Sequence, residues 1–305
     1  MKALLPLIIL ASTALSHAAP TVWISNFSSN SIRRFDADTG VGLGAVTGGS
    51  IGGPLGMTLG PDGLIYAASE ATNTIGRYKQ DGTFLDTFIS TGTAAPTAIA
   101  FNKNKELFVA NFNESSVSRY APGGSYLGKF VLPGVGGMNG PDLGMAFGPD
   151  GHLYVPSFFG NAIQKYDGTT GAYLGDFVPG GGPLTQPRQI LWRGGKVYVS
   201  SDNGNKVLTF DQTTGAYLGD FLTAGASGLS GASGMAFFGD RLYLTSWRTN
   251  KVLQFHGTTG AFEREFISTT LRGPVGLLVV PEPAGLALIS AATVRCMIRK
   301  RRKTS

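Results

Sequence analysis

Cysteine is almost absent from this sequence, because the only one is Cys296, close to the C-terminus. Residues 20–280 can therefore form no disulfide, no thiol nucleophile and no zinc–thiolate site. Charged residues are also scarce, at 14% of the chain. Hydrophobic residues make up 42% of the chain, which is enough to bury a core, so we expect an ordered body held by packing alone.

A basic surface is also absent from the body, although the formal net charge is +6. Seven of the 25 basic residues lie at the two ends of the chain: Lys2, Arg295, Arg299, Lys300, Arg301, Arg302 and Lys303. The part between them is close to neutral. A nucleic-acid partner, which would need a basic face, is not expected.

The N-terminal segment 1–19 has the pattern of a secretory signal peptide. Lys2 precedes an apolar run over 3–15, and small residues at Ala18 and Ala19 follow it. This order predicts export and cleavage by signal peptidase, and the run is short for a membrane span. The alternative is an uncleaved N-terminal anchor.

The C-terminal segment 281–305 has the pattern of a second targeting signal. Pro281, Glu282 and Pro283 precede an apolar stretch over 284–294, and a basic cluster ends the chain. An apolar helix followed by basic residues stops translocation and holds the cluster on the cytoplasmic side. The order resembles the PEP-CTERM sorting signal of Gram-negative bacteria, although Arg295 shortens the apolar run. The resemblance implies a transient stay in the inner membrane, processing by an exosortase, and delivery to the cell surface or extracellular matrix.

The body is an internal repeat. The segment 165–177 recurs almost unchanged at 209–221. Weaker copies are anchored on one aromatic residue in each unit, at Phe35, Tyr78, Tyr120, Tyr166, Phe210 and Phe255. Their spacings of 42 to 46 residues match a four-stranded propeller blade. The 45 glycines fall in clusters between apolar runs, as expected for an all-β chain with many turns.

Six units predict a six-bladed β-propeller over residues 20–280. The innermost strand of each blade is an apolar run such as 144–147 or 234–237, nearly free of charge. The body begins with a second strand at 22–24 and ends with an unattached innermost strand at 274–279. Pairing of these two segments would complete the sixth blade and close the ring.

Units of the form Pro-x-Gly-Met-Ala-Phe-Gly-Pro-Asp-Gly, followed by Leu-Tyr-Val and Val-Leu-x-Phe-Asp, resemble NHL-type repeats. They also look like the six-bladed superfamily that includes gluconolactonase-like enzymes and streptogramin lyases. The resemblance covers about residues 21–280. It implies the fold and leaves the activity open, because propellers serve many unrelated functions.

Ligands of such propellers usually meet the loops that follow the second strands and precede the innermost ones. Aromatic residues occupy four of the six second-to-third-strand loops, and Asn111 and Asp202 lie beside them. The aromatic residues are Phe27, Phe112, Phe158 and Trp247. Such a ring either stacks on sugars or grips a peptide, or it simply packs between blades. Arg188 interrupts the apolar or small residues at the first positions of the innermost strands, either to bind an anion or as a local irregularity satisfied by neighbouring carbonyl groups.

No catalytic residue and no metal ligand is assigned. Only Asp142, Glu70 and Asp202 are acidic near the predicted mouth, which is a thin set of oxygen ligands for a divalent cation. His152 and His256 occupy turn positions, and the repeated Asp36, Asp167 and Asp211 are predicted to cap turns.

We therefore expect a non-catalytic binding or scaffold module at the bacterial surface, without a cofactor, whose partner is a glycan or another surface component. The alternative is a hydrolase or lyase of the gluconolactonase-like or streptogramin-lyase-like type that uses one divalent cation, such as Ca²⁺.

Overall fold

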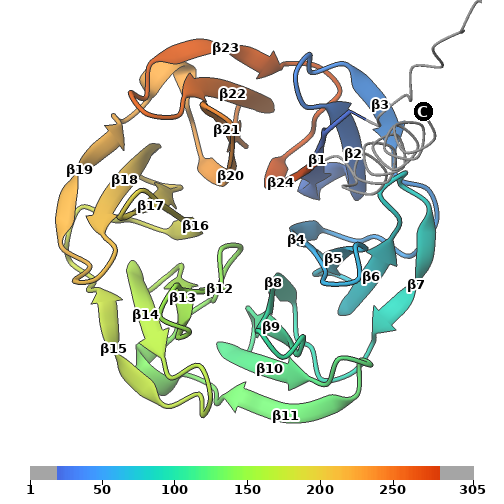
Figure 1. Ribbon diagram of the computed structural model, residues 1–305, viewed down its shortest axis with the longest axis vertical. Helices are drawn as coiled ribbons and strands as arrows, with labels where there is room; N and C mark the ends of the chain where they lie inside the picture. The colour runs from blue at the N-terminus through green and yellow to red at the C-terminus, as the bar shows by residue number, and fades with distance from the viewer. Residues whose placement is uncertain (1–18, 282–305) are drawn as a thin grey trace, which may run out of the picture. The chain divides into compact units, whose positions relative to one another are not determined.

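The computed structural model describes residues 19–281 and shows six four-stranded antiparallel sheets arranged as a ring (Figure 1). The predicted all-β, six-bladed propeller is confirmed. The predicted C-terminal helix, the sorting residues Glu282 and Pro283, and residues 1–18 of the signal segment lie outside the described residues, whereas Pro281 ends them. No helix within residues 19–281 has the length and apolar character needed to cross a bilayer.

We number the blades from the N-terminus and give their strands from the axis outward. Blade 1 holds β24 (Pro274–Val280), β1 (Thr21–Asn26), β2 (Ser31–Asp36) and β3 (Gly42–Ala45). Blade 2 holds β4 (Pro54–Leu59), β5 (Ile65–Ser69), β6 (Thr74–Tyr78) and β7 (Phe84–Ile89). Blade 3 holds β8 (Pro96–Phe101), β9 (Leu107–Asn111), β10 (Ser116–Tyr120) and β11 (Tyr126–Val131).

The other three blades repeat this order. Blade 4 holds β12 (Ala146–Phe147), β13 (Leu153–Ser157), β14 (Ala162–Tyr166) and β15 (Tyr173–Val178). Blade 5 holds β16 (Pro187–Arg193), β17 (Lys196–Ser201), β18 (Lys206–Asp211) and β19 (Tyr217–Leu222). Blade 6 holds β20 (Ala232–Phe238), β21 (Arg241–Ser246), β22 (Lys251–His256) and β23 (Phe262–Ile267).

The ring closes within blade 1, as the sequence predicts. Strand β1 pairs antiparallel with β24, and Val22 lies opposite Val279 while Ile24 lies opposite Leu277. The first and last strands of the body thus share one sheet, although the chain runs through five other blades between them (Figure 1). Closure by backbone hydrogen bonds couples the N-terminal and C-terminal parts of the body.

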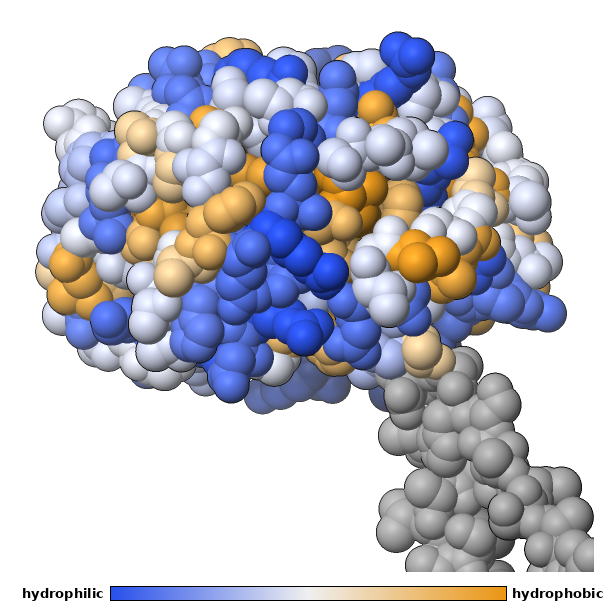
Figure 2. Space-filling view, turned by 90° about the horizontal axis from the view of Figure 1, so that it is seen from above, coloured by the Kyte–Doolittle hydropathy of each residue, from blue (hydrophilic) through white to orange (hydrophobic). Residues whose placement is uncertain are grey.

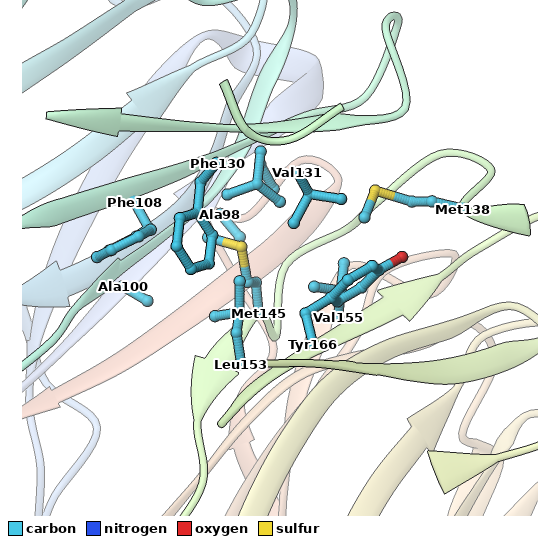
Figure 3. Close-up of a cluster of buried hydrophobic side chains, with 12 residues drawn as sticks. Ala98, Ala100, Phe108, Phe130, Val131, Met138, Met145, Leu153, Val155 and Tyr166 are labelled. Carbon is cyan, nitrogen blue, oxygen red and sulfur yellow. The ribbon is translucent and has the colours of Figure 1, made fainter. Parts of the chain in front are cut away.

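The hydrophobic core lies between adjacent blades. The cluster between blades 3 and 4 joins Phe108 and Phe130 of one blade to Leu153 and Tyr166 of the next (Figure 3). Its rings meet edge-on, with 4.8 Å between the centroids of Phe108 and Phe130. Equivalent clusters fill the other five junctions. Each blade therefore buries both of its faces, and the burial of these apolar surfaces is the main source of stability.

The innermost strands meet at the axis through residues without side chains. A Cβ added to Gly56 would lie 2.5 Å from the carbonyl oxygen of Thr97 in the next blade. Gly144, Gly234 and Gly276 face the backbone of a neighbouring innermost strand in the same way. Glycine at these positions lets six strands converge more closely than side chains would allow.

Blade 4 departs from the prediction that its innermost strand starts at residue 144. Its ladder begins only at Ala146, and Pro141 forms an isolated bridge with Ser157. In blade 2 the residues Pro54 and Gly56 are separated by one residue, whereas Asp142 and Leu143 both stand between Pro141 and Gly144. The extra residue disrupts the ladder, as a bulge does.

The outermost strands are bent and carry exposed apolar side chains. The register shifts at least once in all six pairings of a third strand with its outermost strand. Five blades expose one leucine there, each between 44% and 53% accessible: Leu43, Leu85, Leu127, Leu174 and Leu218. In four of the five a glycine with φ between 99° and 131° follows the leucine. In a side view of the ring, apolar and polar side chains alternate over the outer wall (Figure 2).

The close approach at the axis gives a stability prediction. Gly56→Ala should lower the free energy of unfolding by about 2 kcal/mol, or roughly 4–8 °C of Tm, because the new methyl group collides with backbone. Gly123→Ala is the control, since its Cβ would meet nothing within 4 Å. Thermal unfolding followed by circular dichroism measures both, and equal Tm values for the two variants would contradict close packing at the axis.

Candidate binding site at the mouth of the ring

One position in each blade faces the mouth of the ring. It is the residue that directly follows the second strand, and its backbone N–H donates to the carbonyl just before the innermost strand of the same blade, at 2.8–3.1 Å. We call these six residues the mouth ring: Phe27, Glu70, Phe112, Phe158, Asp202 and Trp247. Four are aromatic and two are acidic. The identical backbone bonds place six different side chains at equivalent points around the axis.

The loops of the mouth are fastened from blade to blade. Three residues after each mouth-ring position stands a residue with positive φ, and its side-chain oxygen accepts the N–H of the loop before the next blade's innermost strand, at 2.7–3.1 Å. These residues are Asn30, Asn73, Ser115, Asn161, Asn205 and Asn250. Asparagine suits this role because it tolerates the left-handed conformation and carries a short acceptor. The mouth is therefore held rigidly even though it consists of loops.

A cavity of about 190 Å³ opens within the mouth ring. Five mouth-ring residues line it, namely Phe27, Glu70, Phe112, Phe158 and Trp247. The innermost strands and the loops that precede them add Leu55, Thr97, Asp142, Arg188 and Val275. The centroids of Phe112 and Phe158 lie 6.3 Å apart. We call this cavity the mouth pocket.

An apolar cluster lies at the base of the mouth pocket. Leu55, Leu143 and Val275 pack together there, and Trp247 rests against them. Leu143 also lines a second cavity of about 580 Å³, whose walls are the largely apolar innermost strands. The cluster therefore separates the mouth pocket from the central channel.

Arg188 is held between two buried carboxylates. Its Nη1 lies 2.9 Å from Oδ2 of Asp142, and its Nε lies 2.6 Å from Oδ2 of Asp202. The guanidinium also stacks on Phe158, 4.8 Å from the ring centroid. Arg248 pairs with the other oxygen of Asp202 at 2.6 Å, and the indole N–H of Trp247 donates to Asp202 at 3.0 Å. The positive charge of Arg188 is thus neutralised by two carboxylates, whereas the second interpretation drawn from the sequence expected neighbouring carbonyl groups.

Burial dominates the electrostatics of this network. Burial raises the pKa of Asp142, and only the nearby Arg188 guanidinium and the backbone N–H of Leu143 oppose that shift. The two carboxylates raise the pKa of Arg188 against its own burial. These groups therefore depend on one another, and loss of one partner leaves a buried charge without compensation.

Glu70 differs from the other acidic residues at the mouth. Burial raises its pKa above the ordinary value, and the negative charge of Asp142 adds to this, while Arg188 acts in the opposite direction. No hydrogen bond to its carboxylate contributes within residues 19–281. Glu70 thus places a half-buried carboxylate in the wall of the mouth pocket.

The acidic residues do not suit a divalent cation. Within residues 19–281 no group of three or more His, Cys, Asp or Glu side chains could hold a metal ion. Arg188 stands between Asp142 and Asp202, where a metal bound by both carboxylates would have to lie. The set Glu70, Asp142 and Asp202 weighed in the sequence is therefore not a ready metal site.

The histidines of the described chain lie away from the mouth. His152 precedes β13, which ends at the mouth with Ser157, and His256 ends β22, which begins at the mouth with Lys251. Nδ1 of His256 accepts the N–H groups of Thr258 and Thr259, and Nδ1 of His152 accepts that of Gly168. Both histidines bond to turn backbone, as the sequence predicts. Asp36, Asp167 and Asp211 accept backbone N–H groups in the same way.

The structure brings most of the predicted site residues together. Phe27, Phe112, Phe158, Trp247 and Arg188 line the mouth pocket, and Asp202 lies beside it in the ion-pair network. Asn111 does not reach the pocket. It ends β9, is fully buried, and donates to Ser116 and Ser118 while accepting the N–H of Ala94.

Sequence reasoning named Glu70 near the mouth only as one of a thin set of oxygen ligands, and not among the binding residues. An asparagine stands three residues after the mouth-ring position in five of the six blades, that of Glu70 included. This repeat is the signal that aligns Glu70 with the aromatic residues of the mouth ring.

Comparison with known proteins shows the fold. No protein-family model matches the sequence, and no curated protein matches it. Solved structures match closely in shape, among them a nidogen/laminin complex (TM-score 0.72, 14% identity, 86% of this chain and 98% of that chain). A putative 6-phosphogluconolactonase from Bacteroides uniformis matches with a TM-score of 0.61 at 17% identity, over 86% of this chain and 99% of that one.

A third similar structure is a virginiamycin B lyase from Staphylococcus aureus with quinupristin, made catalytically inactive by replacing a histidine with alanine (TM-score 0.61, 19% identity, 88% of this chain and 94% of that chain). The similarity of fold to streptogramin lyases, expected from the repeats, is thus confirmed, and it extends to the putative lactonase. At these identities it carries no activity over to this chain.

The buried ion pairs predict a large effect of one substitution. Arg188→Ala should lower the free energy of unfolding by about 3–5 kcal/mol, because it leaves Asp142 and Asp202 buried with too little compensating charge. The exposed Arg272 serves as the control, and Arg272→Ala should change stability by less than about 0.5 kcal/mol. Urea unfolding measures both variants. A loss below about 1 kcal/mol for Arg188→Ala would show that the network is not closed as described.

The raised pKa of Glu70 predicts that Glu70→Gln is more stable than the wild type, by an amount that depends on pH. Above the ordinary pKa of glutamate the unfolded chain is ionised more readily than the folded one, so the wild type loses stability as the pH rises through the raised pKa. Glu70→Gln should therefore raise the Tm at pH 7.5 by about 1–3 °C, a modest shift because the group is half exposed. The difference should vanish near pH 4, and a lower Tm for Glu70→Gln at pH 7.5 would contradict this reasoning.

Proposed function

We propose that this chain is a non-catalytic binding module that takes its ligand at the mouth ring. The observation that carries the proposal is the mouth pocket, where four aromatic side chains from four blades surround one cavity. Aromatic rings provide large contact areas at low entropic cost, and fastened loops reduce the cost of ordering on binding. A preformed concave site lined by aromatic side chains with a few polar groups has the make-up of a ligand pocket.

The polar groups of the mouth favour binding over catalysis. Arg188, Asp142 and Asp202 satisfy one another, so none is poised to transfer a proton or attack a substrate. The two histidines of the described chain lie at the opposite ends of their strands. A metal-dependent hydrolase or lyase remains the alternative, and its support is similarity of fold.

The two ends of the chain support a location at the cell surface for this module. Segment 1–19 would direct export and cleavage by signal peptidase, and segment 281–305 would be processed by an exosortase after a transient stay in the inner membrane. A binding module delivered in this way would meet exopolysaccharide and other surface components. We therefore propose a glycan or another surface component as its ligand.

The proposal predicts that binding depends on the aromatic side chains of the mouth. The full chain carrying Phe112→Ala and Trp247→Ala together should lose affinity for its glycan by about 30-fold, because truncation of such anchors costs on the order of 2 kcal/mol. The measurement is a glycan-array screen of the wild type, followed by titration of the best hit. Phe262→Ala, which removes an exposed ring of β23, is the matched control and should bind like the wild type.

Two outcomes would contradict the proposal. One is a glycan hit that binds the double variant and the wild type equally well. The other is a stoichiometric divalent cation in the purified protein that is lost on Glu70→Ala or Asp202→Ala, which would favour the enzymatic alternative.

A further inference from the structure

The two acidic residues of the mouth ring differ in whether a neighbouring positive charge compensates them. Asp202 is neutralised by Arg188 and Arg248 and also accepts the indole N–H of Trp247. Glu70 faces the pocket with no ion pair or hydrogen bond to its carboxylate within residues 19–281. The two side chains occupy equivalent positions in different blades, so the difference comes from their neighbours and not from the backbone.

The residues that line the mouth pocket, taken with their ion-pair partners, carry a net negative charge. The charged groups among them are the acids Glu70, Asp142 and Asp202 and the bases Arg188 and Arg248. Three carboxylates against two guanidinium groups leave one negative charge. Because both guanidinium groups contact Asp202, and Arg188 also contacts Asp142, the uncompensated charge resides on Glu70. The mouth pocket therefore repels anions and attracts cations.

The remaining walls of the pocket also suit a cation. The faces of aromatic rings attract cations, and this attraction grows when the site excludes water. Arg188 already stacks on Phe158, and Arg248 on Trp247, at 4.8 and 4.7 Å. No such contact covers Phe27 or Phe112 within the described residues, so these two rings can face a ligand.

The size of the mouth pocket limits how much of a ligand can enter it. Pockets that enclose whole drug-sized ligands measure about 300–1,000 Å³. The 190 Å³ available here suit one compact group, while the rest of the ligand stays outside. The apolar cluster of Leu55, Leu143 and Val275 prevents deeper entry.

We propose that the mouth pocket binds an alkylammonium group of the ligand, with Glu70 as its counter-ion and Phe27 and Phe112 as its aromatic walls. This inference rests on the proposed binding function and narrows it to ligands that carry an exposed amine or methylated amine. The raised pKa of Glu70 is consistent with it, because a bound cation would restore the ionised form that burial and Asp142 disfavour. The unfavourable carboxylate is then retained for binding, at the expense of stability.

The test compares choline with 3,3-dimethylbutan-1-ol, which has the same shape but no charge. Isothermal titration of the full chain at pH 7.5 should give at least tenfold tighter binding of choline. Glu70→Gln should remove most of the preference for choline, since only the attraction of the aromatic rings remains, and should leave affinity for the alcohol unchanged. Asp240→Asn, which removes an exposed carboxylate away from the mouth pocket, should bind choline like the wild type. Choline affinity of the wild type should fall as the pH is lowered through the pKa of Glu70.

The outcomes separate this inference from the binding function. Equal affinity for the two probes, or a Glu70→Gln variant that binds choline like the wild type, would overturn the alkylammonium site. The same holds if neither choline nor n-butylammonium binds. In each case, loss of glycan binding in the Phe112→Ala, Trp247→Ala variant would still support the binding function. If Glu70→Gln fails to fold, as judged by circular dichroism, the pH dependence of choline binding by the wild type decides the question.

Discussion

The convergence of six innermost strands on one axis is the constraint on which the rest of the structure depends. Backbone meets backbone there through Gly56, Gly144, Gly234 and Gly276, and an apolar cluster of Leu55, Leu143 and Val275 closes the axis beneath the mouth. No disulfide supports this arrangement, since residues 20–280 contain no cysteine. Stability must come from the six cores between blades, and each of these exists only while its two neighbours stay in place. Because β1 pairs with β24, the blades form a closed ring and each blade depends on its two neighbours.

The same geometry produces the candidate site. Because Leu55, Leu143 and Val275 close the axis beneath the mouth, the mouth is a shallow cup and not the entrance of an open pore. The fold supplies six equivalent positions around this cup, and the sequence fills them unequally. The extra residue of blade 4 increases the inequality, because it brings the carboxylate of Asp142 to the guanidinium of Arg188 in blade 5. One side of the cup is thereby neutralised internally, while Glu70 keeps its charge exposed to the pocket.

The sequence predicts the fold far better than the chemistry of the site. A period of 42 to 46 residues gives six blades, and the half-blades at the two ends of the body give the closure. The aromatic members of the mouth ring follow from the same repeat, because residues in equivalent loops must lie on the same face of the propeller. Ion pairs between side chains of different blades could not be predicted in this way. Asp142 and Arg188 are 46 residues apart, and no local pattern indicates that their side chains meet. Asn111 lies next to a mouth-ring residue in sequence, yet its side chain turns into the blade, where Ser116 and Ser118 satisfy it.

The bent outermost strands affect how copies of the protein associate at high concentration. Each blade ends in a strand whose free backbone edge could accept a strand from another copy, and the ring has six such edges. A straight edge with a row of half-exposed leucines would favour stacking of copies side by side into sheets. Register shifts interrupt all six outermost strands, and in four of them a glycine with positive φ adds to the bend, so a long, regular ladder is disfavoured. The perimeter therefore keeps its apolar side chains without offering a template for strand addition, which lets many copies crowd together and remain separate.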